Sequence, residues 1–460
     1  MKDEPMVTKT IISVSGLRGI VGQSIDPLIA IRYALAFGSC LPAGRVLVAR
    51  DGRETGEMFA QALSSGLMAA GFDVLNAGVC ATPTVGVLVR EQGCTGGIQI
   101  SASHNPPEYN GLKLFGPDGR VISSEEGKAV IEAFEKNDFQ WVDFDQVGQT
   151  DSLGDTTSAH LRKVLETVDV DRIRSRNFKV VLDSNHGAGS VLARPLFEAL
   201  NCDARILGDQ PNGQFAHVPE PTAANLAKVA EDARSFEADV VFCQDPDADR
   251  LAIIDEQGEY IGEEYTLAIT LRHALASASS AGAVNSKVVI NCATSRMSID
   301  LAEEFGCQCI VSAVGEANVT NAMIEHGALY GGEGNGGPID PRVGMVRDSF
   351  VAMAQTLDAM AARDKTPSEL AQEIRSYSIV KSKVQIDQEK ILEVFDALEA
   401  EFPNARADRL DGLRLDFPES WLLVRASNTE PVVRVIAEAT NYEIARGLVS
   451  RATGTIESLG

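Results

Sequence analysis

The chain has little positive charge for its size. Among its 460 residues, 41 are lysine or arginine and 65 are aspartate or glutamate, which gives a formal net charge of −24 at pH 7. Binding a nucleic acid over a broad face releases counterions and requires a basic patch. The acidic balance therefore argues against a nucleic-acid partner. A small phosphorylated ligand needs only a few local cations and stays compatible with the sequence.

Cysteine pairs and long apolar runs are also missing. The eight cysteines are scattered and form no C-x-x-C pair, whereas disulfide scaffolds are short and rich in cysteine. We therefore expect free thiols in a reducing cytoplasm. No apolar run has the ~20 residues that span a bilayer. The opening residues carry acids and lack the apolar core of a secretion signal, so we expect no membrane partner.

The chain does contain a regular alternation of β-rich runs and helical periodicities over about its first 370 residues. Such alternation indicates α/β layers, with helices covering the faces of the sheets. Strands are predicted over residues 45–50, 72–75, 97–101, 178–183, 239–243, 251–255, 287–291 and 309–312. Helices are predicted over residues 56–70, 126–136, 159–168, 191–200, 223–236, 297–305, 318–326 and 349–363.

The final part of the chain has a different pattern, which suggests a separate α+β domain. The predicted order there is a strand over 380–386, a helix over 389–401, strands over 410–415, 421–424 and 432–438, and a helix over 442–456. An acidic polar stretch at residues 143–155 is interpreted as a linker, and further seams are expected near residues 257–262 and 377. The predicted domains are residues 1–150, 151–257, 258–374 and 375–460.

A serine-containing loop follows one of the predicted strands and has the sequence SASHNPPEYNGLK over residues 101–113. Its prolines end the strand, so Ser103 should lie on a tight loop. Ser103 could serve as a nucleophile or phosphoryl carrier, with the imidazole of His104 and the ammonium of Lys113 beside it. Taken alone, the segment is more simply explained as a connecting turn.

An acidic loop, DPDADR at residues 245–250, lies between two predicted strands. Asp245, Asp247 and Asp249 can converge on one hard cation, and such close carboxylates repel one another without it. Arg250 adds a guanidinium suited to phosphate. The spacing is similar to the start of an EF-hand, but Arg250 occupies the position that requires glycine, so we reject that interpretation.

A glycine-rich loop, GGEGNGG, occupies residues 331–337. It contains the spacing G-x-G-x-x-G, but Pro338 follows at once and no helix opens there, so dinucleotide binding is rejected. Glycines let a backbone approach a polar ligand closely, and Glu333 and Asn335 could bind its hydroxyl groups. A flexible hairpin explains the segment equally well on local evidence.

Arginines mark two further segments. The sequence RASNTEPVVR at residues 425–434 places Arg425 and Arg434 around hydroxyl and amide groups, which could form a cradle for a phosphate dianion. A polar hairpin with an arginine on each strand is the plainer alternative. Arg18 lies in SGLRG at residues 15–19 after a strand-like run, and a lone arginine is usually a surface residue.

Together, the four main loops offer a serine beside cations, a carboxylate cluster, a hydroxyl-binding loop and a phosphate cradle, one in each predicted domain. Phosphoryl transfer on a small polyhydroxy compound requires these parts. The sequence also resembles the α-D-phosphohexomutases across nearly its whole length. The resemblance rests on ASHNPPEYNGLK, DPDADR and RASNTEPVVR, with support from SGLRG, from ARDGRETG at residues 49–56 and from EPT at residues 220–222.

The resemblance implies both a fold and a reaction. The fold would be α/β, with three related α/β domains plus a C-terminal α+β, TBP-like domain around a central cleft. Mg²⁺ would be held by Asp245, Asp247, Asp249 and a phosphoryl group on Ser103. That group would pass to a small phosphorylated hexose and give a hexose 1,6-bisphosphate, which turns over and returns its other phosphoryl group to the serine.

The resemblance also assigns site residues. Those implied for catalysis are Ser103, His104, Lys113, Arg18 and Arg250, with Arg18 and Lys113 the better general acid–base candidates. Those implied for substrate binding are Glu333, Asn335, Arg425, Ser427, Asn428, Thr429 and Arg434.

The glycine-rich loop departs from the family pattern. Many members read GE-x-SGH, whereas this chain reads GEGNGG, with Asn335 in place of the serine and Gly337 in place of the histidine. Asparagine both donates and accepts hydrogen bonds, so recognition of a hydroxyl or an amine is retained. This form, together with VGEAN at residues 314–318, looks most similar to archaeal-type phosphoglucosamine mutases and their bacterial relatives. We therefore expect glucosamine phosphate as the substrate and hexose 1,6-bisphosphate as the primer.

Other functions fit parts of the sequence. Glucose or mannose phosphate is the alternative substrate within the family. A metal-dependent sugar phosphatase would explain the acidic loop alone, and a non-catalytic sugar-phosphate binder would explain the altered glycine-rich loop. The intact Ser103 and three aspartates argue against the binder. The sequence is compatible with either a monomer or a homodimer.

Overall fold

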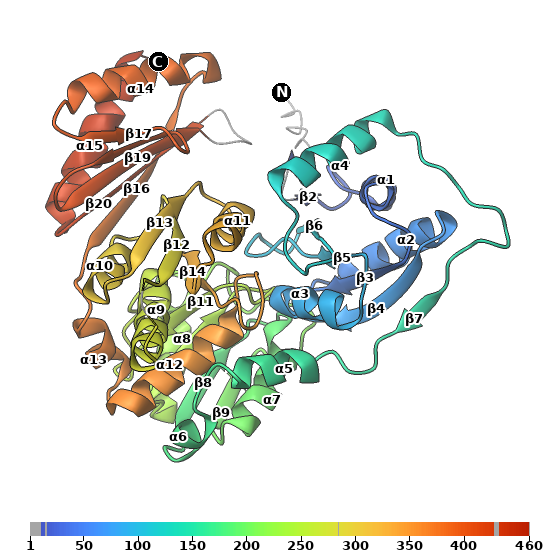
Figure 1. Ribbon diagram of the computed structural model, residues 1–460, viewed down its shortest axis with the longest axis horizontal. Coiled ribbons are helices and arrows are strands. Elements are labelled where there is room, and N and C mark those ends of the chain that lie inside the picture. Colours follow the sequence, from blue (N-terminus) through green and yellow to red (C-terminus); the bar gives the residue numbers. More distant parts are fainter. Residues whose placement is uncertain (1–10, 14–15, 284, 427–431, 460) are drawn as a thin grey trace, which may run out of the picture.

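Four β-sheets, each with its own helices, follow one another along the chain (Figure 1). The computed structural model describes residues 11–13, 16–283, 285–426 and 432–459. Within these residues the first sheet has seven strands, the second and third have four each, and the last has five. The expected fold class, three α/β units followed by an α+β unit, is confirmed.

The three α/β units share one topology: a first strand lies between two parallel neighbours, and the third strand pairs antiparallel with a fourth. The first unit uses β3 (Arg45–Arg50), β4 (Asp73–Val79), β5 (Gly96–Ile100) and β6 (Tyr109–Phe115). The second uses β8 (Lys179–Asp183), β9 (Asp203–Leu207), β10 (Val240–Gln244) and β11 (Leu251–Ile254). The third uses β12 (Lys287–Asn291), β13 (Gln308–Ser312), β14 (Tyr330–Glu333) and β15 (Gly337–Ile339).

The topology puts the three candidate loops in equivalent places. Each loop connects the third and fourth strands of its unit: β5 to β6 for the serine loop, β10 to β11 for the acidic loop, and β14 to β15 for the glycine-rich loop. In an open α/β sheet, ligands bind outside the carboxyl ends of the parallel strands. Each of the three loops begins at the carboxyl end of a parallel strand. All three therefore lie where such a sheet binds its ligand.

Helices cover these sheets. Those of the first unit are α1 (Pro27–Ser39), α2 (Gly56–Ala69), α3 (Thr82–Glu91) and α4 (Ser124–Lys136). Those of the second are α5 (Ser158–Leu165), α6 (Val170–Arg174), α7 (Gly189–Ala199) and α8 (Ala227–Phe236). Those of the third are α9 (Glu263–Ser280), α10 (Met297–Glu304), α11 (Glu316–His326), α12 (Ser349–Arg363) and α13 (Pro367–Gln372). None of the described helices is long and apolar enough to cross a membrane.

Every strand and helix predicted from the pattern overlaps an observed one. Some observed elements, however, were not predicted. The pattern predicts a linker over residues 143–155, whereas Thr150–Ser152 form β7, a strand parallel to β4 at the edge of the first sheet. All three residues are exposed, so no apolar alternation marks the strand. Helix α9 was also not predicted, because its buried residues run almost continuously along it and leave little periodicity.

The other edge of the first sheet is formed by β1 (Ile11–Ser13) and β2 (Gly16–Ile20), which form an antiparallel pair. Strand β2 pairs with β6. This pairing places Arg18 opposite Gly111 and next to the strand that follows the serine loop. Arg18 therefore lies within the sheet rather than at an isolated surface position.

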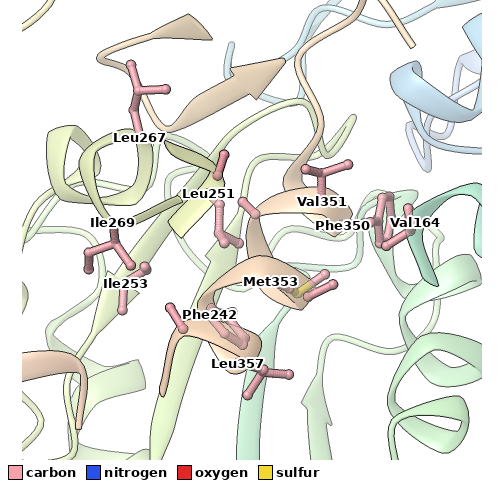
Figure 2. Packing of buried hydrophobic residues seen from close by; sticks show 14 of the residues in the cluster. Val164, Phe242, Leu251, Ile253, Leu267, Ile269, Phe350, Val351, Met353 and Leu357 are labelled. Carbon is pink, nitrogen blue, oxygen red and sulfur yellow. The ribbon is translucent and has the colours of Figure 1, made fainter. Parts of the chain in front are cut away.

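One hydrophobic core joins the second and third units (Figure 2). Phe242 of β10 and Leu251 of β11 pack in the same cluster as Leu267 of α9 and Phe350 of α12. Helix α12 belongs to the third unit by sequence, yet it contacts α5, α6 and β11 of the second. Because this core is continuous and close-packed, the acidic loop and the glycine-rich loop are held in a fixed relation.

The C-terminal unit is an antiparallel sheet in the order β16–β20–β19–β18–β17. Its strands are β16 (Ser378–Gln385), β17 (Arg406–Asp408), β18 (Leu413–Asp416), β19 (Ser420–Ala426) and β20 (Val432–Ala439). Helices α14 (Ile391–Glu401), preceded by the 3₁₀ turn η1 (Gln388–Lys390), and α15 (Tyr442–Leu459) pack on one face. The other face places Trp421 and Leu423 against Cys292 of the third unit, so the two units are docked through an apolar contact.

Candidate active site

Ser103 lies at a tight turn between β5 and β6. Its backbone adopts the left-handed conformation, with φ of 48°, and its N–H donates to the Ser101 hydroxyl at 2.9 Å. The Ser103 side chain is buried. Its Oγ donates to Asp245 Oδ2 at 2.7 Å and lies 3.3 Å from His104 Nδ1. The serine of the first unit is therefore in direct contact with the acidic loop of the second.

Arg53 holds this turn in place. Its guanidinium, fully buried, donates to four backbone carbonyls of the loop and to Asp51 Oδ2 at 3.1 Å. The four acceptors are the carbonyl oxygens of Ser103, Asn105, Pro106 and Tyr109, at 2.6 to 3.0 Å. Asp51 in turn accepts from the Ser101 hydroxyl at 2.6 Å. Sequence analysis did not single out either residue, although both lie in the segment ARDGRETG.

The three aspartates of the acidic loop form one buried cluster, in which a ligand oxygen of each lies within 4.8 Å of the others. The Oδ2 atoms of Asp247 and Asp249 have protein donors: Thr82 Oγ1 at 2.6 Å and Lys113 Nζ at 2.9 Å, respectively. Their Oδ1 atoms are buried and have no hydrogen-bond partner. Unpaired buried carboxylate oxygens that converge in this way fit a small hard cation such as Mg²⁺.

The charges within the aspartate cluster also favour a bound cation. Burial, reinforced by the charges of Asp247 and Asp249, raises the pKa of Asp245 well above its ordinary value. Burial also disfavours the charged form of Asp249, but Arg347, Lys113 and Arg250 outweigh it and lower its pKa. Without a cation the cluster therefore favours a proton on Asp245, and a divalent cation would relieve this repulsion.

Two basic residues, Lys113 and His104, lie at the aspartate cluster and the serine, respectively. Burial disfavours the charged form of Lys113, but Asp249 and Asp247 outweigh it and raise its pKa, so the ammonium stays charged. Burial, together with Arg250 and Arg18, lowers the pKa of His104 to about 3, so its imidazole is neutral near pH 7. His104 is therefore a hydrogen-bond partner of Ser103 and a weak base. The structure brings together all the catalytic candidates and the three aspartates.

The two arginines among the catalytic candidates, Arg18 and Arg250, have different partners. Arg18 Nη1 donates to Asn105 Oδ1 at 2.7 Å, which ties β2 to the serine loop. Arg250 lies at the end of the acidic loop, where its Nε is 3.8 Å from Asp249 Oδ1 and has no hydrogen-bond partner. A buried guanidinium N–H without an acceptor can receive an anion such as phosphate.

The glycine-rich loop presents a carboxylate that is already well coordinated. Glu333 Oε1 accepts from Asn291 Nδ2 at 2.7 Å and from the Gly315 N–H at 3.1 Å. Its Oε2 accepts from Arg347 Nη1 at 2.8 Å and weakly from Asn335 Nδ2 at 3.4 Å. The Asn335 Oδ1 is buried and has no partner. This loop therefore contains a fixed carboxylate and a free acceptor beside it.

Arg347 connects the two loops, and sequence analysis missed it. Its Nη2 donates to Asp249 Oδ2 at 2.6 Å and its Nη1 to Glu333. It precedes a predicted helix, where nothing local marks a buried arginine. In the fold, Gly337 of the glycine-rich loop lies against the Arg347 side chain.

The phosphate cradle is only partly described. Ser427, Asn428 and Thr429 lie outside the described residues. Arg425 and Arg434 face each other on β19 and β20, and Arg425 pairs with Asp411 at 3.2 Å. Asp411 also accepts from the Val314 N–H at 2.9 Å, which joins the cradle to the third unit. Within the described residues, no hydrogen bond or ion pair links either arginine to Ser103 or the three aspartates.

A buried serine in contact with a carboxylate cluster, with lysine and arginine side chains on the same cluster, is the arrangement that phosphoryl transfer requires. Family models for phosphoglucomutase/phosphomannomutase match the chain in order: α/β/α domain I over residues 9–141, domain II over 158–258, domain III over 263–377 and the C-terminal domain over 380–453. The chain belongs to the phosphoglucomutase/phosphomannomutase family and is a phosphohexomutase, an isomerase that transfers a phosphoryl group. The resemblance inferred from the motifs is confirmed.

Individual relatives agree with this assignment. A phosphoglucomutase/phosphomannomutase of Thermococcus kodakarensis is 35% identical over 438 residues, covering 94% of this chain and 95% of the relative. A probable phosphoglucosamine mutase of Methanopyrus kandleri is 33% identical over 437 residues, with the same coverage of 94% and 95%. A solved phosphoglucomutase/phosphomannomutase family protein from Burkholderia thailandensis has a TM-score of 0.84 and 26% identity, covering 98% of this chain and 97% of that one. The two relatives have different substrate names, so the comparisons define the reaction class and leave the hexose open.

Proposed function

We propose that the chain interconverts hexose 6-phosphate and hexose 1-phosphate through a phosphorylated Ser103, with glucosamine phosphate as the preferred substrate. A hexose 1,6-bisphosphate is the intermediate and the primer. The observation that carries the proposal is the 2.7 Å contact between Ser103 Oγ and Asp245, beside two carboxylates that each have an unpaired buried oxygen.

In the proposed transfer, a substrate hydroxyl attacks the phosphorus carried by Ser103, and the bond from phosphorus to Ser103 Oγ breaks. The Ser103 oxygen takes a proton, and the hydroxyl loses one. Lys113 is the candidate for supplying a proton: despite its burial, neighbouring aspartates keep it charged, and the same aspartates raise its pKa and so make it a weak acid. Arg18, whose pKa burial lowers, is the candidate for exchanging the other proton.

The three aspartates and the Ser103 phosphate would hold Mg²⁺, whose charge stabilises the charge on the transferring phosphoryl group. Arg250, whose buried Nε has no hydrogen-bond partner, is the candidate for binding a phosphoryl oxygen. His104 stays neutral and shares a hydrogen bond with Ser103 Oγ. These residues would bind and orient the phosphoryl group. Positioning and charge stabilisation account for most of the catalysis in phosphoryl transfer.

The sugar and its second phosphate would be bound by the other two loops. Glu333 and Asn335 would bind hydroxyl or amine groups. For Asn335 the reason is its buried Oδ1, because an acceptor without a donor is costly until a ligand supplies one. Arg425 and Arg434, with Ser427, Asn428 and Thr429, would hold the non-reacting phosphate. The preference for glucosamine phosphate rests on the GEGNGG and VGEAN forms of the third unit.

The test is a coupled assay with glucosamine, glucose and mannose phosphates, primed with glucose 1,6-bisphosphate. We expect the highest kcat/KM with glucosamine phosphate. Ser103→Ala should abolish turnover, while the matched control Ser65→Ala, an exposed serine of the same unit, should retain it. Full activity of Ser103→Ala would falsify the mechanism. A higher kcat/KM for glucose or mannose phosphate would overturn only the substrate assignment.

Mass spectrometry separates the mutase from a sugar phosphatase. We expect a stable phosphoryl group on Ser103 after incubation with the bisphosphate. Steady release of inorganic phosphate, at the rate of substrate loss, would favour the phosphatase instead.

A further inference from the structure

Gly337 lies against the side chain of Arg347, which stands just before α12 in the same unit. A methyl group built on Gly337 would lie 2.8 Å from Arg347 Cγ and closer still to its Cδ. Gly337 does not have a left-handed backbone, so conformational freedom does not explain the glycine. The space does: the Arg347 side chain passes through the position where a side chain at residue 337 would begin.

Arg347 uses this route to reach three carboxylates. Beyond Asp249 and Glu333, its Nε lies 3.5 Å from Glu316 Oε2, and its backbone N–H donates to Glu316 Oε1 at 2.9 Å. The guanidinium is buried, with 8% of the side chain exposed. A planar guanidinium offers donors in a fixed fork and can hold two carboxylates at a set angle.

Two of these carboxylates have different tasks in the proposed reaction. Asp249 belongs to the cluster that would hold the phosphoryl group through Mg²⁺, and Glu333 belongs to the loop that would bind the sugar. Arg347 takes only Oδ2 of Asp249 and leaves Oδ1 without a hydrogen-bond partner, so it does not compete for a cation. Arg347 is therefore a side-chain link between the carboxylates of the two binding loops, beside the backbone hydrogen bond from the Leu251 N–H to the Gly336 carbonyl at 2.9 Å.

We infer that Arg347 is a positioning residue, which locks the glycine-rich loop to the acidic loop, and that Gly337 is required because it admits Arg347. The inference rests on the proposed function, since its consequence is the alignment of the sugar with the phosphoryl group on Ser103.

A double-mutant cycle of Gly337→Ala and Arg347→Ala tests it. In the parent background the new methyl group collides with Arg347, so we expect Gly337→Ala to lower both Tm and kcat. In the Arg347→Ala background Cγ and Cδ are gone and only Cβ remains, 3.0 Å from the new methyl group, so the same substitution should cost clearly less than in the parent. Misalignment of this kind reduces kcat on the order of 100-fold, and residues in contact give non-additive effects.

Arg347→Lys separates positioning from stability. Lysine keeps the charge but has one nitrogen, so it can hold Asp249 or Glu333 and not both in the fork geometry. We expect kcat to fall about 10-fold or more while Tm stays within a few degrees of the parent. The matched control is Arg414→Lys, another buried arginine, paired with Asp416 at 3.0 Å, which should retain kcat.

The outcomes are distinct. Coupled losses in Tm and kcat, with a low kcat for Arg347→Lys, support the inference. Additive losses in the cycle, or parent-like kcat in Arg347→Ala, overturn it while the proposed function stands. A parent enzyme that turns over no hexose phosphate refutes the proposed function, and the inference with it. Gly154→Ala, at a glycine with open space around it, controls for the added methyl group.

Discussion

Arg53 should decide whether Ser103 is presented to the acidic loop at all. The substitution Arg53→Met removes the donor for four backbone carbonyls and leaves Asp51 without its cation. Methionine keeps much of the volume, so the change tests the hydrogen bonds rather than the packing. We expect the loop from residue 101 to residue 111 to open far more often than in the parent.

The size of the effect follows from the contacts. A typical buried hydrogen bond contributes about 1 kcal/mol net, so four of them give about 4 kcal/mol. Breaking one partner of a buried ion pair costs about 3–5 kcal/mol, which is a similar figure for the same side chain. About 4 kcal/mol corresponds to an increase of about 10³-fold in the opening equilibrium, since each 1.4 kcal/mol is tenfold.

Hydrogen exchange is the appropriate assay, because a four-unit chain need not unfold in one step. Amides of the serine loop should exchange up to about 10³-fold faster in Arg53→Met, while amides of β12 and β19 stay unchanged. Phosphorylation of Ser103 by glucose 1,6-bisphosphate should fall in parallel. The control is Arg32→Met, which removes an arginine bound to Asn137 at the surface. Parent-like exchange in the Arg53 variant would refute the idea that this arginine fixes the loop.

Three further predictions follow. Asp247→Asn removes a charge from the cation cluster and should weaken Mg²⁺ binding at least about 10-fold in calorimetry; unchanged affinity would remove this residue from the site. Although burial lowers the pKa of His217, the hydrogen bond and charge of Asp183, 2.7 Å away, outweigh it and raise the pKa above its ordinary value. A raised folded pKa stabilises the fold below about pH 6.5, and this contribution is lost as pH rises through the folded value. The Tm advantage of the parent over His217→Gln should therefore shrink between pH 6 and pH 8.5, and a constant difference would contradict the assignment. Trp421→Phe removes the donor to Glu438, 2.7 Å away in the contact between the last two units, and should cost about 1–3 kcal/mol; an unchanged midpoint of thermal unfolding would contradict that role.

The parts of the site that sequence analysis found are those whose residues are contiguous. Asp245, Asp247 and Asp249 alternate along one short loop, so their convergence on a cation could be inferred from spacing alone. Ser103 and His104 are neighbours in the chain. Helix α12 was predicted with its observed bounds, residues 349–363.

The parts that were missed depend on residues far apart in the chain. Arg53 acts on a loop about 50 residues away, and Arg347 acts on a carboxylate 98 residues away. No periodicity or spacing marks either one, because both are single charged residues next to ordinary elements. The polar edge strand β7 was missed for a related reason, since only its pairing with β4 makes it a strand.

The sequence by itself determined the class of protein, the order of its loops and the residue types that handle phosphate, because short loops carry their chemistry locally. Only the tertiary structure decided which loop faces which. Ser103 meets Asp245 across 142 residues, and Arg347 bridges the acidic and glycine-rich loops. Such contacts arise from the packing of three units with the same topology, whose equivalent loops leave equivalent ends of the sheets. That packing is a property of the folded chain as a whole, and no segment of the sequence encodes it alone.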